Sequence, residues 1–460
     1  MKLPKPRARA RAAARERRGV ALLLAFLVLI VIVAIVSQID IMTKTDARVA
    51  FNDIALTKMD LAIESAMLEV HEMLAEDAQA AAAAEGAETG GMEPPDAGAG
   101  EGAAPGGPGG GEAAAVDSKM DQWARPQGTS VNDLQLRIFI QDEDSKYNVL
   151  NMLVEDEEEA ERAYERVVEI LDMCREGTAE DIDSSDAQEM ARVMRDHYTE
   201  RSRSFLPRPS LLTDTEKDDQ LGMPLTLREV VVLEPFEERH FEDYFDDEGE
   251  RVHSIGSFLT VWTAPLTGEG ADPAELPFGE GGLAVNVNTA PAAVLKSLMS
   301  PRQIDFRTWD AVIEYRNEEE ESEDSEEEEA VPVLDEFGEE IVPTKFFDDL
   351  EELNEVRGWD DMQPEAKAEV EALLTVESRV FSIFVTARRE TAAAALQQMD
   401  FRTPSEREQY ERSGTSLMRT VRAVVWRMPA DDGVTIVPLI RWEVLSYMPL
   451  EVLDLPEDWY

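Results

Sequence analysis

The sequence predicts an α+β protein that combines a long N-terminal helix, part of which crosses a membrane, with a small antiparallel sheet and a large all-helical domain. Three observations lead to this fold class. An unbroken apolar run covers residues 20–36, and apolar residues then recur at helical spacing to about residue 83. Segments in which apolar and polar residues alternate close the chain, as in strands with one buried face.

The apolar run is long enough to cross a bilayer. With its mixed continuation to Ile41 it contains about 22 residues, which span roughly 33 Å as a helix, against about 30 Å for a bilayer core. Eight Lys and Arg residues and a single acid, Glu16, precede the run, and no comparable basic cluster follows it. Because basic flanks stay in the cytoplasm, we expect one membrane pass with the rest of the chain outside.

A small residue, Gly19, lies between the basic residues and the apolar run, whereas Ser37 to Asp40 after the run make a poor signal-peptidase site. This placement resembles the class III leader of pilins and pseudopilins, which a prepilin peptidase cuts after Gly. The resemblance implies that residues 1–19 are a leader and that Val20 is the first mature residue, N-methylated after cleavage. The alternative is an ordinary single-pass anchor that is never cut.

The helical pattern predicts one helix over residues 20–84, because neither Gly nor Pro interrupts it before Gly86. A juxtamembrane stalk or coiled coil is the alternative interpretation. Residues 85–116 are mainly Gly, Ala, Pro and Glu with almost nothing to bury, so we expect a disordered linker over 85–130.

The charge of the chain limits its partners. The 460 residues contain 44 Lys and Arg against 97 Asp and Glu, a net charge of −53, which disfavours nucleic acids and anionic lipid surfaces. The lone Cys174 excludes an intramolecular disulfide and a cysteine-based zinc site. The four His residues have no metal-ligand spacing and no nucleophile elbow occurs, so we expect no enzyme.

After the linker, the pattern predicts a first strand within 131–147, a helical domain over 148–375 and further strands within 376–460. The last strands alternate over 380–388, 417–427 and 434–444. Asp431, Asp432 and Gly433 form a good hairpin turn between the final two, so we expect an antiparallel sheet.

Two similar polar corners open the two halves of the helical domain. Their side chains can bind the backbone of a turn and cap the helix that follows. The first corner contains Asn148 and Asn151, and the second contains Asn286, Asn288 and Thr289. Short helical segments follow each corner in a similar order, which suggests that one unit occurs twice.

An acidic run over 318–329 holds ten acids in twelve residues. Such a run repels itself and predicts a solvated loop within the second half of the domain. Clustered carboxylates also suit calcium, although the spacing of an EF-hand is absent.

The leader at Arg18, Gly19 and Val20, both corners and the final strands together resemble general secretion pathway protein K, the large minor pseudopilin family of type II secretion. The resemblance rests further on the second corner's segment 285–291 with Val294 and Leu295. It implies a pilin-like fold with an inserted helical domain, anchored in the bacterial inner membrane with its C-terminal domain in the periplasm. It implies a place at the tip of the pseudopilus, where the subunit initiates or caps assembly for protein export.

The resemblance also implies partners and a cofactor. The partners are the minor pseudopilins I, J and H, the prepilin peptidase and the inner-membrane secretion platform. Leu24 is the fifth mature residue, where most pseudopilins have Glu, and an apolar residue there fits a subunit with none above it. The family's calcium is expected in the helical domain, with no ligands assigned.

Two alternatives remain open. The same features suit a minor pilin-like component of a related type IV filament. The segment from Val285 to Arg316 also resembles a helix-hairpin-helix that binds nucleic acid, but its hairpin at 299–302 lacks the Gly-x-Gly that holds a phosphate.

Overall fold

A computed structural model describes most of the chain in two compact units, Met1–Leu61 and Ala62–Tyr460. The described residues are 6–88, 116–132, 134–154, 156–202, 226–246, 249–262, 284–319, 344–389, 417–430 and 433–453. Most of the expected linker and of the acidic run lies outside them.

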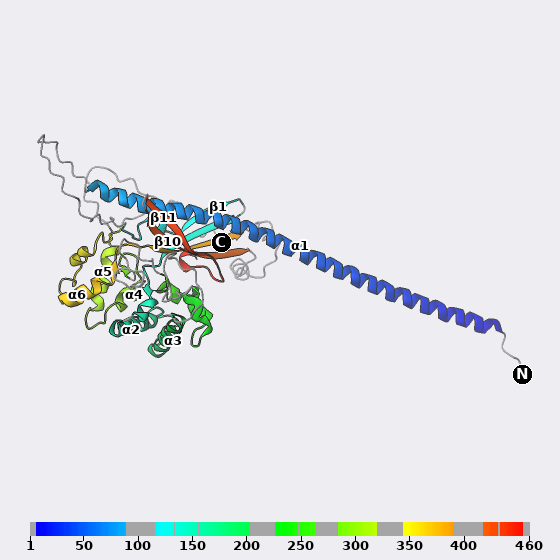
Figure 1. The fold of residues 1–460 in the computed structure, drawn as a ribbon. Coiled ribbons are helices and arrows are strands. Elements are labelled where there is room, and N and C mark those ends of the chain that lie inside the picture. The colour runs from blue at the N-terminus through cyan, green and yellow to red at the C-terminus, as the bar shows by residue number, and fades with distance from the viewer. Residues whose placement is uncertain are drawn as a thin grey trace, which may run out of the picture. The chain divides into compact units, whose positions relative to one another are not determined.

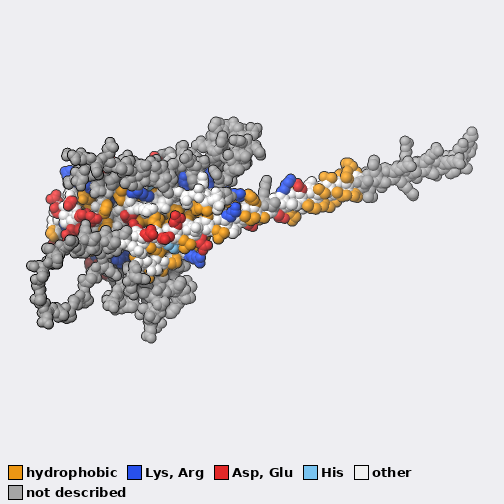
Figure 2. Space-filling view, turned by 90° about the horizontal axis from the view of Figure 1, so that it is seen from above, with side chains coloured by type: hydrophobic (Ala, Val, Ile, Leu, Met, Phe, Trp, Pro, Cys, Tyr) orange, Lys and Arg blue, Asp and Glu red, His pale blue; other side chains and the backbone are white. Residues whose placement is uncertain are grey.

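The longest element is α1, Pro6–Glu88, which passes through Gly19 without a break. The expected helix over 20–84 is therefore extended at both ends. The residues before Gly19 are rich in Ala and Arg, which favour helix, and one Gly inside a helix costs only about 1 kcal/mol relative to Ala. Within the first unit the large apolar side chains from Phe26 to Val36 are 46–62% exposed, and orange side chains cover this stretch in Figure 2.

Among the described residues, α1 is the one helix long and apolar enough to cross a membrane, with a mean hydropathy of 2.5 over its most apolar window. Its apolar window is not buried inside the protein. Length, composition and exposure together make this helix a candidate membrane anchor.

A five-stranded antiparallel sheet is the centre of the second unit (Figure 1). Its order is β1-β2-β9-β10-β11. The strands are β1 Gln127–Val131, β2 Leu134–Asp142, β9 Val380–Arg389, β10 Met418–Ala430 and β11 Gly433–Leu445. The expected hairpin is present, because β10 and β11 pair up to Ala430 and Gly433.

Residues 116–130 differ from the expected linker, because they form part of the sheet region. They contain the 3-10 helix η1, Gln122–Ala124, and the edge strand β1. Trp123 is 1% exposed and its ring meets the ring of Phe381 of β9 edge-on, with the ring centres 4.9 Å apart. The burial of one large aromatic side chain thus stabilises a segment that was predicted to be disordered because the residues before it are rich in Gly.

The second unit's part of α1 lies on the sheet. Ile63, Val70 and Leu74 are fully buried at helical spacing. Polar contacts reach the strands from the same side of the helix, as Asp77 pairs with Arg427 of β10 at 3.2 Å. This arrangement of a long helix along an antiparallel sheet is the one expected from the sequence.

A large domain is inserted between β2 and β9, and we call its two parts, each of which begins at one Asn corner, the first copy and the second copy. The first copy contains β3 Tyr147–Asn148, η2 Val149–Leu153, α2 Glu157–Met173, α3 Ser184–Ser202, η3 Leu227–Val232, η4 Glu238–Phe241, β4 Tyr244–Phe245, β5 Arg251–Val252, η5 Ile255–Ser257 and β6 Leu259–Thr260. The second contains β7 Val285–Asn286, α4 Ala292–Ser297, α5 Phe306–Asn317, η7 Leu350–Glu355, α6 Pro364–Glu371 and β8 Leu374–Thr375.

Local contacts stabilise the elements within each copy. Asp156 caps α2 by accepting the N–H groups of Glu158 and Glu159, and the buried face of α2 recurs at helical spacing. In the second copy, Trp309 and Trp359 are fully buried and meet edge-on with ring centres 5.8 Å apart. One buried apolar cluster includes side chains of both copies.

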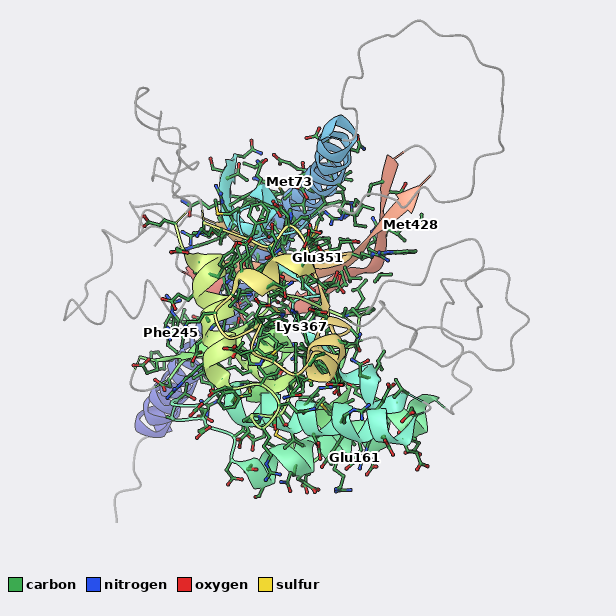
Figure 3. The ribbon with its side chains drawn as sticks, turned by 90° about the vertical axis from the view of Figure 1, so that its left-hand side faces the viewer. Met73, Glu161, Phe245, Glu351, Lys367 and Met428 are labelled. Atoms are coloured by element: carbon green, nitrogen blue, oxygen red, sulfur yellow. The ribbon has the colours of Figure 1, made fainter. Side chains whose placement is uncertain are left out.

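The inserted domain is not purely helical, as three two-stranded ladders, β3·β6, β4·β5 and β7·β8, accompany its helices. Figure 3 shows Met73 of α1 and Met428 of β10 on one side, Glu161 of the first copy on the opposite side, and Glu351 and Lys367 of the second copy between them. The short helix α9, Leu450–Leu453, ends the described chain. The expected α+β fold class is confirmed.

Candidate functional site at the junction of the sheet and the inserted domain

Each copy of the inserted unit is closed by the same pair of polar residues. Asn148 of β3 lies opposite Thr260 of β6, and Asn286 of β7 lies opposite Thr375 of β8, in two parallel ladders. Both Asn side chains accept the backbone N–H two residues ahead, at 3.0 and 2.9 Å. Both Thr hydroxyls accept the backbone N–H two residues ahead at 3.1 Å. The two ladders therefore make matching contacts, and the duplication of the whole unit stays a prediction.

The corners also bind more distant segments. Asn148 donates to the carbonyl of Trp262 at 2.8 Å. Asn288 donates to the carbonyl of Phe347 at 3.0 Å and accepts its N–H at 2.8 Å, so one side chain satisfies one backbone position completely. The carbonyl of Asn151 accepts the N–H of Val154 at the end of η2.

The second corner binds the sheet region through a buried network of hydrogen bonds, the first of two at this junction. Asn286, which is fully buried, donates to the carbonyl of Asp117 at 3.1 Å and to the hydroxyl of Ser378 at 2.7 Å. Ser378 donates to Asp142 at the end of β2, and Thr289 donates to the same carboxylate oxygen, both at 2.5 Å. The corner is thus hydrogen-bonded to three segments that belong to the sheet region.

The first corner reaches the sheet through a second network around Glu143. The Glu143 carboxylate accepts from Lys146 at 2.7 Å, from Arg422 of β10 at 3.0 Å and from Thr260 at 2.5 Å, and it also binds Ser382 of β9. Glu143 and Lys146 are almost completely buried. Arg422 of β10 therefore belongs to this network, and Arg427 of β10 joins the network of the second corner by binding the Asp117 carboxylate and the Ser378 carbonyl.

The pKa values of the central carboxyl groups of the two networks, Asp142 and Glu143, are shifted in opposite directions. Burial and the neighbouring Asp144 charge raise the pKa of Asp142 to about 7. For Glu143, burial raises the pKa, but the Lys146 and Arg422 cations with their hydrogen bonds outweigh it and lower the pKa to about 2. At neutral pH Glu143 is therefore ionised, whereas Asp142 holds a proton more readily than an ordinary carboxyl group.

These shifts predict that stability passes through a maximum near about pH 4. Glu143 has a folded pKa below its unfolded value, so its contribution is present above about pH 4.5 and is lost as pH falls towards 2. Asp142 has a raised folded pKa, so its contribution is lost as pH rises from about 4 through 7. Urea midpoints measured by tryptophan fluorescence should fall on both sides. Asp142→Asn should make the fall on the alkaline side less steep, and the raised pKa values of Asp117 and Asp144 account for the fall that remains. A midpoint that rises steadily to about pH 8 contradicts the assignment.

The polar groups of the junction attach the inserted domain to the sheet. Its acids are bound to cations, hydroxyls and backbone N–H groups, and in the described part of the chain no group of three or more His, Cys, Asp or Glu side chains is placed to hold a metal ion. Calcium therefore stays a prediction, and the acidic run over 320–329 lies outside the described residues.

Sequence reasoning identified the corners but missed their partners Asp117, Ser378 and Arg427. Arg427 is the partner that carried a usable signal, because it occupies a buried position in an alternating strand, where an unpaired charge is not tolerated. Gly19, Val20 and Leu24 lie within α1, and their side chains are outside the described part.

Of three comparisons with known proteins, the one with solved structures found a similarity. No family model matches the chain, and no curated protein matches it. Among solved structures, the chain is similar to a chain of the GspK-GspI-GspJ complex from the type 2 secretion system of enterotoxigenic Escherichia coli. The TM-score is 0.38 and the identity 11%, over 72% of this chain and 87% of the other.

Proposed function

We propose that this chain is a minor pseudopilin of a type II secretion system, located at the tip of the pseudopilus, where it initiates or caps assembly. The observation that carries the proposal is the order of elements in α1. A basic segment, a Gly and an exposed apolar stretch follow one another in a single helix, whose later part packs on an antiparallel sheet. A subunit that must first be anchored in a membrane and then enter a filament needs such a helix.

In this proposal, the basic residues hold the N-terminus in the cytoplasm, and the prepilin peptidase cuts between Gly19 and Val20. Val20 is then N-methylated, and the apolar part of α1 stays in the inner membrane until assembly. Leu24 places no carboxylate at the fifth mature position, which fits a subunit that has no other subunit above it.

The inserted domain provides the bulk expected of a terminal subunit. The two buried networks hold it firmly on the sheet, so it cannot move aside to admit another subunit above. Its partners would be the minor pseudopilins I, J and H. A tip subunit of a related type IV filament would share these features, and the genes next to this one would distinguish the two systems.

Changes at Gly19 should affect leader processing strongly and selectively. Gly19→Asp is expected to reduce processing at least about tenfold, because a charged side chain does not fit a peptidase site shaped for Gly. Gly19→Ala should slow it much less, and Ala14→Asp, inside the leader, serves as the charge control. Immunoblots of pulse-labelled cells resolve the precursor from the shorter mature form. Equal processing of all three variants contradicts cleavage at this position.

The tip assignment is tested by co-purification. The full chain, expressed with the I and J pseudopilins of the same organism and extracted in mild detergent, should give a stable complex of one copy each by native mass spectrometry. Failure of every pairing, with each protein folded by circular dichroism, contradicts tip assembly while leaving the anchor and leader untouched.

A further inference from the structure

A continuous chain of polar contacts leads from α1 into the inserted domain. Asp77 of α1 pairs with one guanidinium nitrogen of Arg427 at 3.2 Å. The other terminal nitrogen of Arg427 binds the carboxylate of Asp117 and, at 2.6 Å, the carbonyl of Ser378. Asn286 then binds the carbonyl of Asp117 and the hydroxyl of Ser378. We call these five residues the helix-to-corner relay.

The members of the relay differ in their access to water. Asp117, Ser378 and Asn286 are buried completely, and the side chain of Arg427 is 6% exposed. The side chain of Asp77 is 26% exposed, so it is the one member that meets solvent. Water can replace the contacts of Asp77, but it cannot reach the inner contacts without opening the junction.

Arg427 connects the two halves of the relay, because its planar fork fixes the direction of every bond it donates. With Asp77 in place, one nitrogen is held towards the helix and the other towards Asp117 and Ser378. Removal of Asp77 leaves a buried cation with a single carboxylate. The guanidinium must then shift, and the carbonyl and carboxylate that share Asn286 shift with it.

We propose that the helix-to-corner relay couples the position of α1 on the sheet to the attachment of the second copy of the inserted domain, so that release of the helix at Asp77 loosens the corner at Asn286. Networks of this kind, hydrogen-bonded throughout and largely buried, transmit the loss of one contact to the next. The coupling does not depend on the proposed function. In a filament subunit it would make the inserted domain respond to how the helix is seated.

The molecule contains a matched control. Glu64 of α1 pairs with Arg441 of β11 at 3.0 Å, which is the same kind of contact between helix and sheet. Its side chains are 55% and 83% exposed, and the pair borders solvent instead of a buried network. Loss of this pair should therefore have no effect at Asn286.

Hydrogen exchange of the full chain in detergent micelles, measured by mass spectrometry, tests the coupling. Asp77→Asn should speed exchange of the amides in 284–298 by about fivefold or more, because the loss of one contact in the relay weakens the next. Glu64→Gln should leave them within about twofold of the wild type. Circular dichroism confirms that both variants are folded. Unchanged exchange over 284–298 in Asp77→Asn overturns the proposal.

A double-variant cycle separates coupling from general loosening. In an Asn286→Ala background, Asp77→Asn should add less than about twofold to the exchange of 284–298, because the relay is already broken. Equal factors in both backgrounds mean that the two sites are independent, which also overturns the proposal. If Asn286→Ala does not fold, Ser378→Ala takes its place in the cycle.

Discussion

At about pH 8.5, replacing Arg427 with Ala is expected to lower the free energy of unfolding by about 3–5 kcal/mol. The guanidinium is buried between the carboxylates of Asp77 and Asp117 and also binds the carbonyl of Ser378. Its removal leaves a buried acid without a cation, which is among the most costly single changes a protein can undergo. Urea titration of the full chain in detergent, followed by tryptophan fluorescence, measures the loss, because all seven Trp residues lie beyond residue 122.

Two comparisons identify the cause of that loss. Arg441→Ala removes an exposed pair with α1 and should cost at most about 1 kcal/mol. Burial raises the pKa of Asp117 to about 8, so the effect of Arg427→Ala should be larger at about pH 8.5 than at about pH 6, where Asp117 is protonated. Equal losses for both Arg variants contradict the buried ion pair.

Replacing Asn286 with Ala is expected to cost about 2 kcal/mol or more, because it leaves two buried groups without a partner at about 1–3 kcal/mol each. These are the carbonyl of Asp117 and the N–H of Asn288. The hydroxyl of Ser378 also loses the N–H group that it accepts, although it still donates to Asp142. The control is Asn354→Ala, which removes an exposed Asn that donates to the carbonyl of Glu351 and should change stability by less than about 0.5 kcal/mol. Similar losses at both positions contradict a special role for the corner.

Local patterns in the sequence were enough to predict most of the elements. The apolar run, the helical spacing beyond it and the alternating segments each arise within one element, from which of its sides faces the core and which faces solvent. Therefore α1, β2 and the last three strands could be predicted. The two Asn corners could also be predicted, because their caps act within a few residues. The 3-10 helices and two-residue strands were less visible, since they are shorter than any periodicity.

The junction could not be predicted from local patterns. Arg427 and Asp117 are 310 residues apart, and Ser378 and Asp142 are 236 residues apart. Which acid meets which cation depends on how the strands pair, and a chain with 97 acids offers too many choices. The structure of residues 116–130 was not predicted, because their Gly-rich neighbourhood indicated a linker although Trp123 is buried.

The central claim is that α1 enters a filament as a mature helix that begins at Val20. Intact-mass spectrometry of the protein, extracted from membranes of cells with and without the prepilin peptidase, tests it most directly. We expect a chain that begins with N-methylated Val20 when the peptidase is present and a chain that retains residues 1–19 when it is absent. A chain that retains residues 1–19 in both cells, or one that lacks the apolar stretch, would contradict the claim.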